Sequence, residues 1–332
     1  MHWLEACWYR HSPLHVALWP LSILFGALTG LRRLLYRTGL LPSAQAGIPV
    51  IVVGNITVGG TGKTPCVIWL AQWLADQGFK PGIVSRGYGG SERNPRRAQP
   101  DADPGVVGDE AVLLARRSAC PVWIGRSRVA AVRALRAAHP DCNVIISDDG
   151  LQHYALRRDV ELVVIDGERG WGNGMLLPAG PLREPLPRLA GVDALIINGD
   201  AAMAPPSLPP DVPRFALALE GSAFYNLRDP DRRVDAAYFA GLTVHAMAAI
   251  GNPQRFFRHL RRMGISFTTH PYPDHHQYTP LDCAWGEHAT VIVTEKDAVK
   301  CERMAGEDWW ALRVGAAPDP ALGAMILHKI GK

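Results

Sequence analysis

Residues 54–65 combine glycines, a lysine and hydroxyl side chains in the order typical of a phosphate-binding loop. They read Gly-Asn-Ile-Thr-Val-Gly-Gly-Thr-Gly-Lys-Thr-Pro and follow the apolar run Pro-Val-Ile-Val-Val. A glycine-rich turn between a strand and a helix presents backbone N–H groups to phosphate oxygens, and the helix N-terminus adds positive partial charge. The consensus pattern has glycine where this chain has Thr57. A chance glycine-rich turn is the alternative, but the strand-to-helix context favours a nucleotide site.

The end of this loop carries the side chains that can contact phosphate and metal. Lys63 can reach the β- and γ-phosphates, and Thr64 can hold Mg²⁺ through its hydroxyl. Guanine and adenine nucleotides both bind such loops, so the motif alone does not name the reaction. The residues expected to bind the nucleotide are Gly59, Gly60, Thr61, Gly62, Lys63, Thr64 and Pro65.

Two adjacent carboxylates follow another apolar run. Asp148 and Asp149 come directly after Asn-Val-Ile-Ile-Ser, at the expected carboxyl edge of a strand, where α/β proteins place their sites. Either can bind Mg²⁺ directly or through water, and both are candidates. Asp166 ends a similar run but supplies only one acid. A plain strand cap remains the structural alternative for all three.

The elements that must position these residues alternate between apolar strands and helical patterns. Helical patterns span residues 63–77, 110–117 and 127–138. Continuous apolar strands joined by helices predict a parallel sheet covered on both faces. The predicted strands are Val50–Val53, Gly82–Ser85, Val122–Ile124, Val144–Ser147, Leu162–Ile165 and Ala194–Ile197.

A proline-rich segment then separates a second, smaller α/β unit. Five prolines lie between positions 205 and 213, which is typical of a domain boundary. Beyond it, strands are expected at residues 244–250, 265–270 and 290–294, with a helix through 256–263. We therefore divide the chain into an N-terminal helical segment 1–40, a P-loop core 41–215, and a smaller C-terminal domain 216–332.

The N-terminal segment has the pattern of an interfacial membrane helix. Val16–Leu31 is nearly uncharged, but it is shorter than the roughly 20 residues of a spanning helix, and Pro20 interrupts it. On a helix, a small or polar stripe would lie opposite an apolar one. The polar stripe is His15, Trp19, Ser22, Gly26, Thr29 and Arg33, and the apolar stripe is Leu18, Leu21, Leu24, Phe25, Leu28 and Leu35.

Such a helix can lie in the plane of a bilayer surface. Its three tryptophans, Trp3, Trp8 and Trp19, would sit near headgroup level. The basic cluster of Arg32, Arg33 and Arg37 would face anionic lipid. The alternative is a helix packed on its own domain; we favour peripheral attachment to a cytoplasmic membrane face.

Composition excludes several other classes. The chain has 332 residues, of which 48% are hydrophobic and 20% charged, which argues against disorder. A net charge of +4 is too small to indicate nucleic-acid binding. Its six cysteines form no CxxC pair, which argues against a zinc site or disulfide scaffold and indicates a reducing, cytoplasmic compartment.

Several motifs occurring in a fixed order make a resemblance specific. The chain resembles the tetraacyldisaccharide 4′-kinases, the lipid A 4′-kinases of Gram-negative envelope synthesis, from Val53 to Lys300. The leucine of the aspartate motif is often phenylalanine in that family, and Thr57 is itself a family feature. The matching motifs are Val-Gly-Asn with Gly-Gly-Thr-Gly-Lys-Thr-Pro (53–65), Ser-Arg-Gly-Tyr-Gly (85–89), Gly-Asp-Glu (108–110), Asp-Asp-Gly-Leu-Gln-His (148–153), Leu-Pro-Ala-Gly-Pro-Leu-Arg-Glu (177–184), Pro-Asp-His (273–275) and Thr-Glu-Lys-Asp-Ala-Val-Lys (294–300).

This resemblance implies a reaction, a partner and a place in the cell. It implies transfer of the ATP γ-phosphate to the 4′-hydroxyl of a tetraacylated glucosamine disaccharide 1-phosphate, forming lipid IVA, with Mg²⁺ as cofactor. Since such an acceptor stays in the bilayer, we expect the protein on the cytoplasmic face of the bacterial inner membrane, as a monomer. The expected fold is an α/β P-loop NTPase-like parallel-sheet domain with a second, smaller α/β domain and an amphipathic N-terminal helix.

The resemblance also suggests roles for residues outside the P-loop. Asp109, at a predicted helix start, is the expected catalytic base, with a plain helix N-cap as its alternative. His275 would orient it, and His276 is the adjacent rival. Core packing, a loop ion pair and a structural turn are the alternatives for the remaining candidates. Those expected to meet acceptor or phosphate are Arg86, Tyr88, Gln152, His153, Arg183 and Glu184, while Glu295, Lys296 and Asp297 suit nucleotide or interdomain contact.

Two other classes of function remain to be weighed. A P-loop GTPase or metallochaperone-type regulator would need a guanine-specificity motif of the Asn-Lys-x-Asp type. The nearest stretch, Asn198-Gly199-Asp200, lacks the lysine. A non-enzymatic membrane scaffold would leave the acids at 109, 148 and 149 unexplained.

Overall fold

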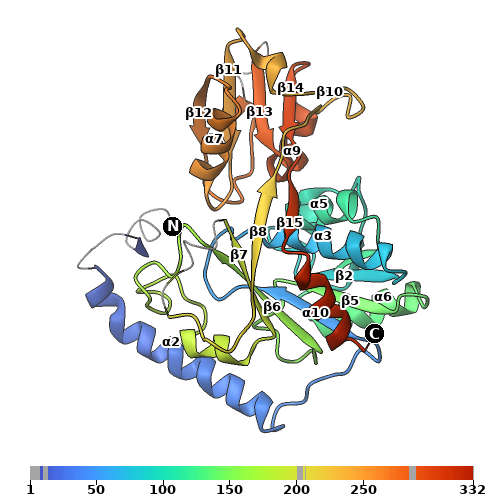
Figure 1. Ribbon diagram of the computed structural model, residues 1–332, viewed down its shortest axis with the longest axis vertical. Coiled ribbons are helices and arrows are strands. Elements are labelled where there is room, and N and C mark those ends of the chain that lie inside the picture. The colour runs from blue at the N-terminus through green and yellow to red at the C-terminus, as the bar shows by residue number, and fades with distance from the viewer. Residues whose placement is uncertain (1–7, 10–13, 200–204, 206, 284–288, 332) are drawn as a thin grey trace.

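The protein consists of two α/β bodies and one long N-terminal helix (Figure 1). The computed structural model describes residues 8–9, 14–199, 205, 207–283 and 289–331. The larger body contains a nine-stranded sheet and the smaller a six-stranded sheet. The α/β class and the two-body organisation expected from the sequence are therefore present.

The nine-stranded sheet of the larger body is parallel except at its two edges. All six predicted strands are found, each displaced by two residues at most. In spatial order the strands are β15 (Gly315–Pro318), β8 (Arg214–Glu220), β7 (Ala194–Asn198), β6 (Val160–Asp166), β1 (Val50–Gly54), β5 (Val144–Asp148), β2 (Pro81–Ser85), β4 (Val122–Ile124) and β3 (Arg96–Ala98).

Helices cover both faces of this sheet, as the continuous apolar strands predict. Ile51 and Val53 of β1 enter one core, and Val50 and Val52 enter the core on the opposite face. This strand therefore contributes apolar side chains to two layers at once. The helices of this body are α3 (Lys63–Asp76), α4 (Pro104–Val107), α5 (Asp109–Arg117), α6 (Arg128–Ala138), α10 (Ala321–Lys329) and the 3₁₀ helix η1 (Leu186–Gly191).

The smaller body has its own sheet and cores. Its strands run in the order β10 (Arg233–Val234), β9 (Phe224–Asn226), β14 (Trp309–Leu312), β13 (Thr290–Thr294), β11 (Val244–Ala248) and β12 (Phe267–Pro271). Its helical segments are η3 (Ala236–Phe239), α7 (Pro253–Arg262), α8 (Pro280–Cys283), α9 (Glu295–Cys301) and η5 (Glu302–Met304).

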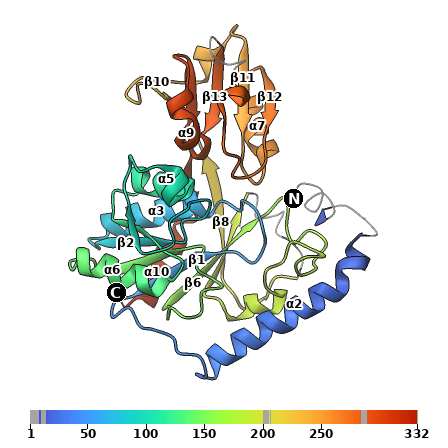
Figure 2. The same cartoon turned by 180° about the vertical axis from the view of Figure 1, so that it is seen from behind.

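The C-terminal boundary differs from the expected division at 216–332. Strand β15 pairs antiparallel with β8, so the chain leaves the larger body along β8 and returns along β15 (Figures 1 and 2). Helix α10 then packs on α3, where a Cβ on Gly323 would lie 2.4 Å from the Trp73 ring. Sequence order suggested one crossing, whereas edge pairing in the larger sheet requires two. The last residues therefore belong to the larger body.

Helix α2 (Leu14–Arg37) lies along the larger body (Figure 2). Small and polar residues of its predicted polar stripe face that body. Buried Ser22 donates a hydrogen bond to Leu176 O at 2.7 Å and accepts one from Ala179 N at 3.0 Å. A Cβ on Gly26 would lie 2.7 Å from Leu176. The 167–189 segment is thus the platform for α2, because it meets the small residues that permit close approach.

The outward side of α2 is apolar and unpacked. Leu21, Leu24 and Leu28 are each more than half exposed. The helix is long and apolar enough by length and composition to cross a membrane, and it is the only such helix within the described residues. Helix α2 therefore has opposed sides, but their membership differs from the prediction. Leu18, Phe25 and Leu35, assigned to the apolar stripe, are half-buried, because Leu18 and Phe25 lie one turn from Ser22 and share its inward face.

Two tryptophans depart from the predicted pattern and one cannot be compared. Trp19, assigned to the polar stripe, is 54% exposed and lies among the outward apolar residues. Trp8 is buried and donates through Nε1 to Pro178 O at 3.0 Å, so it anchors the platform and does not face headgroups. Trp3 lies outside the described residues.

Candidate active site

The loop between β1 and α3 has a backbone that only glycine accommodates at its last turn. Gly62 has φ +93°, and a Cβ there would lie 2.3 Å from the Asn198 side-chain nitrogen. That nitrogen donates to Thr61 O at 2.8 Å, so the end of β7 braces the loop. Lys63 then begins α3, with its charge at the helix N-terminus where anions bind.

Thr57, the departure from the consensus, lies in extended backbone. It forms a bridge with Leu182, and on either side Val58 N donates to Pro181 O (2.8 Å) and Arg183 N to Ile56 O (2.6 Å). The start of the phosphate loop is thus paired like a short strand with the 177–184 segment. This pairing explains why glycine is not needed at Thr57, and it carries Arg183 to the site.

Asp149 lies between two cations at the carboxyl edge of the sheet. Lys63 Nζ is 3.5 Å from one of its oxygens, and Arg183 is 3.0 Å from the other. Burial alone would raise the pKa of this carboxyl, but Lys63 and Arg183 hold it below its usual range. Asp149 also has φ +47°, an unusual backbone for a non-glycine residue and one that occurs at functional sites. An incoming phosphate would meet two cations already gathered here.

Asp148 has the opposite electrostatic character. It is buried and accepts a hydrogen bond from Ser85 Oγ at 3.1 Å. Burial, followed by the negative charges of Glu110 and Asp149, raises its pKa to about 7. A carboxyl destabilised as an anion by its neighbours is a group that a divalent cation would ionise.

The chemistry of these donors suits Mg²⁺ and a phosphate chain. Thr64 begins α3 beside Lys63, and hydroxyl and carboxylate oxygens are the hard ligands that Mg²⁺ prefers. The buried hydroxyls of Thr61 and Ser147 have no hydrogen-bond partner among the described residues. Buried polar groups normally have hydrogen-bond partners, so these hydroxyls fit a region that binds a polar ligand.

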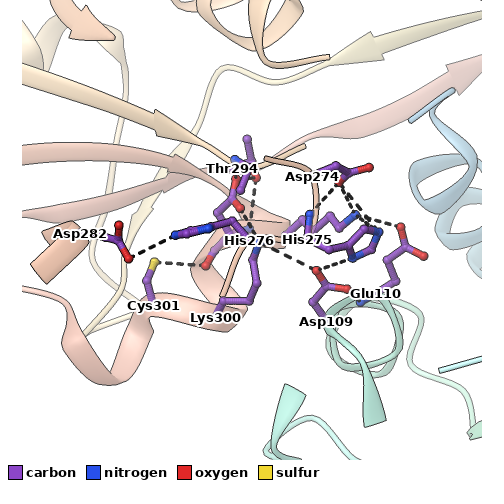
Figure 3. A network of polar contacts seen from close by, with 12 residues as sticks. Asp109, Glu110, Asp274, His275, His276, Asp282, Thr294, Lys300 and Cys301 are labelled. Carbon is purple, nitrogen blue, oxygen red and sulfur yellow. Dashed lines mark hydrogen bonds and ion pairs between the residues drawn. The ribbon is translucent and has the colours of Figure 1, made fainter. Parts of the chain in front are cut away.

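Asp109 and His275, assigned to separate domains, lie in contact (Figure 3). Asp109 is the first residue of α5, and His275 follows β12 in the smaller body. Asp109 Oδ2 is 3.2 Å from His275 Nδ1, while Oδ1 accepts the Glu110 N–H at 2.8 Å. The carboxylate therefore both satisfies the start of its helix and pairs with the imidazole. His276 instead pairs with Asp282 at 3.2 Å.

Lys296 determines which ring nitrogen of the neutral His275 imidazole carries the proton. Its Nζ lies 3.1 Å from His275 Nε2 and also pairs with Glu110 (3.1 Å) and Asp274 (3.2 Å). An ammonium can only donate, so Nε2 accepts and the proton of a neutral imidazole resides on Nδ1, facing Asp109. His275 has φ +58°, a strained backbone that turns the ring toward Asp109.

The charges around Asp109 favour its ionised form. Burial raises its pKa, but the hydrogen bond from His275 and the charges of Lys296 and Lys300 outweigh burial and lower it. Lys300 lies 3.9 Å from Asp109 and 2.9 Å from Asp297, and its side chain is buried. Asp109 is thus a buried anion held ready to accept a proton.

Ion pairs and a close backbone contact hold the smaller body against the larger one. Arg116 pairs with Glu302 and Arg117 with Glu295, joining α5 to α9 and η5. A Cβ on Gly251 would lie 2.2 Å from Gly60 N, so the loop after β11 touches the phosphate loop. The structure therefore has the two bodies closed over the site.

Asp166, the rival metal ligand, is held by this interface. It ends β6, on the other side of β1 from Asp148. Its Oδ1 accepts the N–H groups of Glu168 (3.0 Å) and Arg169 (3.3 Å), and Arg255 of the smaller body lies 3.8 Å away. One Asp166 oxygen is therefore occupied structurally, whereas Oδ2 has no hydrogen-bond partner among the described residues, so Asp166 stays a candidate beside the acid pair.

Two of the expected acceptor-binding residues are exposed, and one of them, Tyr88, lies beside the Asp109–His275 pair. Arg86 is exposed and makes no ion pair with the part of the chain that the structure describes. Tyr88 is 53% exposed, and its ring lies 4.7 Å from the His275 ring in an edge-on arrangement. Tyr88 is therefore not packed in the core, which was its alternative interpretation.

Three other expected acceptor-binding residues instead form hydrogen bonds with protein groups around the site. Glu184 is buried and accepts hydrogen bonds from Gln152 Nε2 (3.1 Å) and the Tyr154 hydroxyl. Gln152 also donates to Asn55 O at 3.0 Å, beneath the phosphate loop. His153 Nε2 accepts the Arg128 N–H at 3.2 Å, and burial with nearby arginines lowers its pKa to about 4. Their side chains are occupied by other protein groups and do not face an open site.

Two further residues lie beside the carboxylates, although the sequence motifs did not predict a role for either. Arg128 is buried, donates to Asp148 O at 3.1 Å, and has its pKa lowered to about 10 by burial. Glu110 links the Lys296 ammonium to Asp148 by its charge. Arg128 follows the end of β4 at the same sheet edge, and this position after a predicted strand could have identified it from the sequence.

The guanine-specificity alternative finds no support in the described residues. Asn198 uses its side chain to hold Thr61 O, and its own carbonyl accepts from Arg255 at 3.1 Å. Asp200 lies outside the described residues. The candidate stretch therefore contributes at least one residue to bracing the phosphate loop.

The family model, the curated relatives and the solved structure that resemble this chain all belong to one kinase family. A family model described as tetraacyldisaccharide-1-P 4'-kinase matches residues 14–331. The tetraacyldisaccharide 4'-kinase of Methylobacillus flagellatus is 49% identical over 328 residues, covering 99% of this chain and 96% of that protein. The protein of the same name from Alkalilimnicola ehrlichii is 50% identical over 322 residues, covering 96% and 94% respectively. The crystal structure of LpxK from Aquifex aeolicus in complex with ATP superposes with a TM-score of 0.80 at 27% identity, over 96% of this chain and 99% of that one.

Proposed function

The chain belongs to the tetraacyldisaccharide 4′-kinase family, and from this premise we propose which of its residues carry out the reaction. The protein is an ATP-dependent kinase of lipid A biosynthesis that phosphorylates the 4′-hydroxyl of a tetraacylated disaccharide 1-phosphate. The observation that carries the proposal is the 3.2 Å contact between Asp109 and His275.

Asp109 is the base that accepts the proton of the attacking 4′-hydroxyl. Phosphoryl transfer needs a group that orients or deprotonates the acceptor, and the remaining catalysis is positioning and charge neutralisation. His275 holds the carboxylate through its Nδ1–H and, with Lys296, keeps it ionised. Tyr88 is exposed beside this pair, and both Tyr88 and the exposed Arg86 contact the acceptor.

Lys63 and the glycine loop hold the phosphates of ATP. Lys63 stands at the start of α3 and pairs in this structure with Asp149, which it exchanges for phosphate oxygens when ATP binds. Thr64, Asp148 and Asp149 are the residues that would hold Mg²⁺, which when bound neutralises the charge on the phosphates. Arg183 adds a second positive charge at the same edge.

The two bodies must separate for nucleotide to enter. The loop containing Gly251 lies against Gly60 of the phosphate loop. The crossings at β8 and β15 are the proposed hinge, because within the described residues the backbone passes from one body to the other along these two strands. Closure then returns His275 to Asp109, so the base is complete only when the site is covered.

Replacing Lys296 by glutamine tests the assignment of Asp109 as the base. The variant loses a charge that lowers the pKa of Asp109, so that pKa should rise. Because the base acts when ionised, the acid limb of the kcat/KM–pH profile should move to higher pH. Transfer of label from γ-labelled ATP to the acceptor in neutral detergent micelles measures this. Glu302→Gln, which breaks another α5 ion pair, is the matched control; an acid limb unchanged in Lys296→Gln would remove Asp109 as the base.

The outward face of α2 is the proposed membrane attachment, on the cytoplasmic side of the inner membrane and with the protein as a monomer. Its leucines are exposed while the opposite stripe is packed on the protein. An apolar helix face of this kind binds the boundary between headgroups and acyl chains. The acceptor, which carries four acyl chains, can then be met without leaving the bilayer.

Replacing Leu24 and Leu28 by glutamine should release the protein from vesicles. Each leucine is more than half exposed, so the loss falls on membrane burial and not on the core. At ~1.5 kcal/mol or more for each buried leucine, partitioning should fall about 10²-fold. Leu242→Gln with Leu281→Gln, two exposed leucines of the smaller body, is the matched control. Sedimentation with neutral vesicles measures it, and equal losses in both double variants would refute attachment through α2.

A further inference from the structure

A basic cavity lies between the C-terminal part of α2 and the larger body. Its volume is about 400 Å³. Arg33 and Arg37 of α2 form one wall, and Arg157, Arg158 and Arg188 form another. None of its lining residues belongs to the phosphate loop, the acid pair or the Asp109–His275 pair, so the reaction described above does not account for it.

Most of the cavity's positive charge is not neutralised by the protein. Its two carboxylates are already paired. Glu161 binds both Arg158 (2.8 Å) and Arg188 (2.7 Å), and Asp193 binds Lys329 (2.9 Å).

The remaining three arginines lack such partners. Arg33, Arg37 and Arg157 make no ion pair within the described ranges. Five arginines against two carboxylates leave an excess of three positive charges around one cavity. Such an arrangement is complementary to an anion with several oxygens, and guanidinium groups suit phosphate in particular.

The position of the cavity indicates where that phosphate comes from. Leu31 and Leu34, next to Arg32 and Arg33 on α2, are 53% and 55% exposed and belong to the outward apolar face. A helix immersed through that face lies at the boundary between headgroups and acyl chains. Arg33, partly buried against the larger body, would then be at the depth of lipid phosphates.

We propose that this cavity binds the phosphate headgroup of an anionic phospholipid of the surrounding bilayer. The proposal rests on the proposed attachment through α2 but adds a discrete site to it. The bound headgroup bridges α2 and the larger body, with Arg33 and Arg37 contacting it from the helix and Arg157 from the body. The lipid so held is neither nucleotide nor acceptor, and it sets the protein's depth and orientation at the membrane.

Adjacent arginines on α2 allow a matched test. Arg33 lines the cavity, whereas exposed Arg32 does not, although both have the same charge and lie on one helix. We compare Arg33→Gln/Arg157→Gln with Arg32→Gln/Arg262→Gln; Arg262 is an exposed arginine of the smaller body. The probe is vesicles of phosphatidylcholine, with or without phosphatidylglycerol, and the readout is the fraction of protein that sediments.

The cavity variant should lose the preference for anionic vesicles. Charge-assisted hydrogen bonds predict a loss of about 10²-fold for the two cavity arginines. A diffuse surface potential predicts only about fivefold per arginine near the surface, and therefore a similar loss for Arg32. Binding to pure phosphatidylcholine should be unchanged in both variants, and Arg33→Lys/Arg157→Lys should recover part of the preference.

Three results would overturn the proposal. Equal losses of vesicle binding in the two double variants would mean that the arginines act only through a diffuse surface potential. Weaker binding of the cavity variant to vesicles of phosphatidylcholine alone would mean that the cavity does not recognise anionic lipid. A raised KM for the acceptor in neutral detergent micelles without phospholipid would assign the cavity to the acceptor's own phosphate. Attachment through α2 is judged separately, by Leu24→Gln/Leu28→Gln on neutral vesicles, so the two ideas can fail independently.

Discussion

Replacing Asp109 or His275 by alanine should lower kcat by about 10²- to 10⁴-fold, the range typical of general-base catalysis. The loss falls on kcat because Asp109 acts on the acceptor hydroxyl, while nucleotide is held by the phosphate loop. His275 contacts Asp109 at 3.2 Å, so the two should behave as one unit. The double variant should therefore lose little beyond the worse single variant.

Two neighbouring residues serve as controls for this prediction. Asp103 caps α4 by accepting the Gly105 N–H at 2.8 Å, so Asp103→Ala removes a helix-capping carboxylate without touching the dyad. His276→Ala removes an adjacent imidazole that pairs with Asp282 instead. Both controls should keep nearly full kcat. Multiplicative losses in the Asp109/His275 double variant would mean that His275 acts independently, and it would then be reassigned to acceptor binding.

Replacing Lys63 by alanine should lower turnover by about 10²- to 10³-fold, the cost of removing one preorganised electrostatic contact to a transition state. In the structure Lys63 contacts Asp149 at 3.5 Å at the start of α3, where its charge can pass to a phosphate oxygen. The fold should be retained, since Arg183 still pairs with Asp149. Steady-state kinetics with saturating ATP and acceptor measures the loss.

Lys80→Ala is the control for Lys63, because it removes an exposed lysine paired with Asp141 on the same body. Its kcat should equal that of the unchanged protein. Thermal unfolding of both variants separates a loss of fold from a loss of chemistry. A near-normal rate in Lys63→Ala would exclude the phosphate loop from the mechanism.

Motifs with a local basis were predictable from the sequence. The strand before the phosphate loop, the helix after it and the glycine at Gly62 follow from patterns spanning a few residues. That α2 has a packed and an exposed side was also predictable from helical periodicity, although Leu18 and Phe25 are half-buried and Trp19 is exposed, opposite to their predicted stripes. The sequence shows threonine at position 57 but not the reason for it, because Thr57 pairs with Leu182, which is distant in the chain.

The orientation of candidate side chains was less predictable. Gln152, His153 and Glu184 belong to recognised motifs, yet the fold turns them toward Asn55, Arg128 and Tyr154. A motif shows that residues occur together but not which way their side chains point. Burial and hydrogen-bond partners decide this, and they come from segments distant in the chain.

The α/β class, the phosphate loop and the acidic edge of the sheet could be predicted from the chain, because spacing and periodicity are local properties of a sequence. The contact between Asp109 and His275 depends on how the two bodies pack, since the residues are 166 positions apart. The tertiary structure also decided that β15 and α10 return to the larger body, because an edge strand pairs with whatever neighbour the fold brings to it. The charge of Asp148 depends likewise on burial beside Glu110, since its pKa reflects neighbours in space and not in sequence.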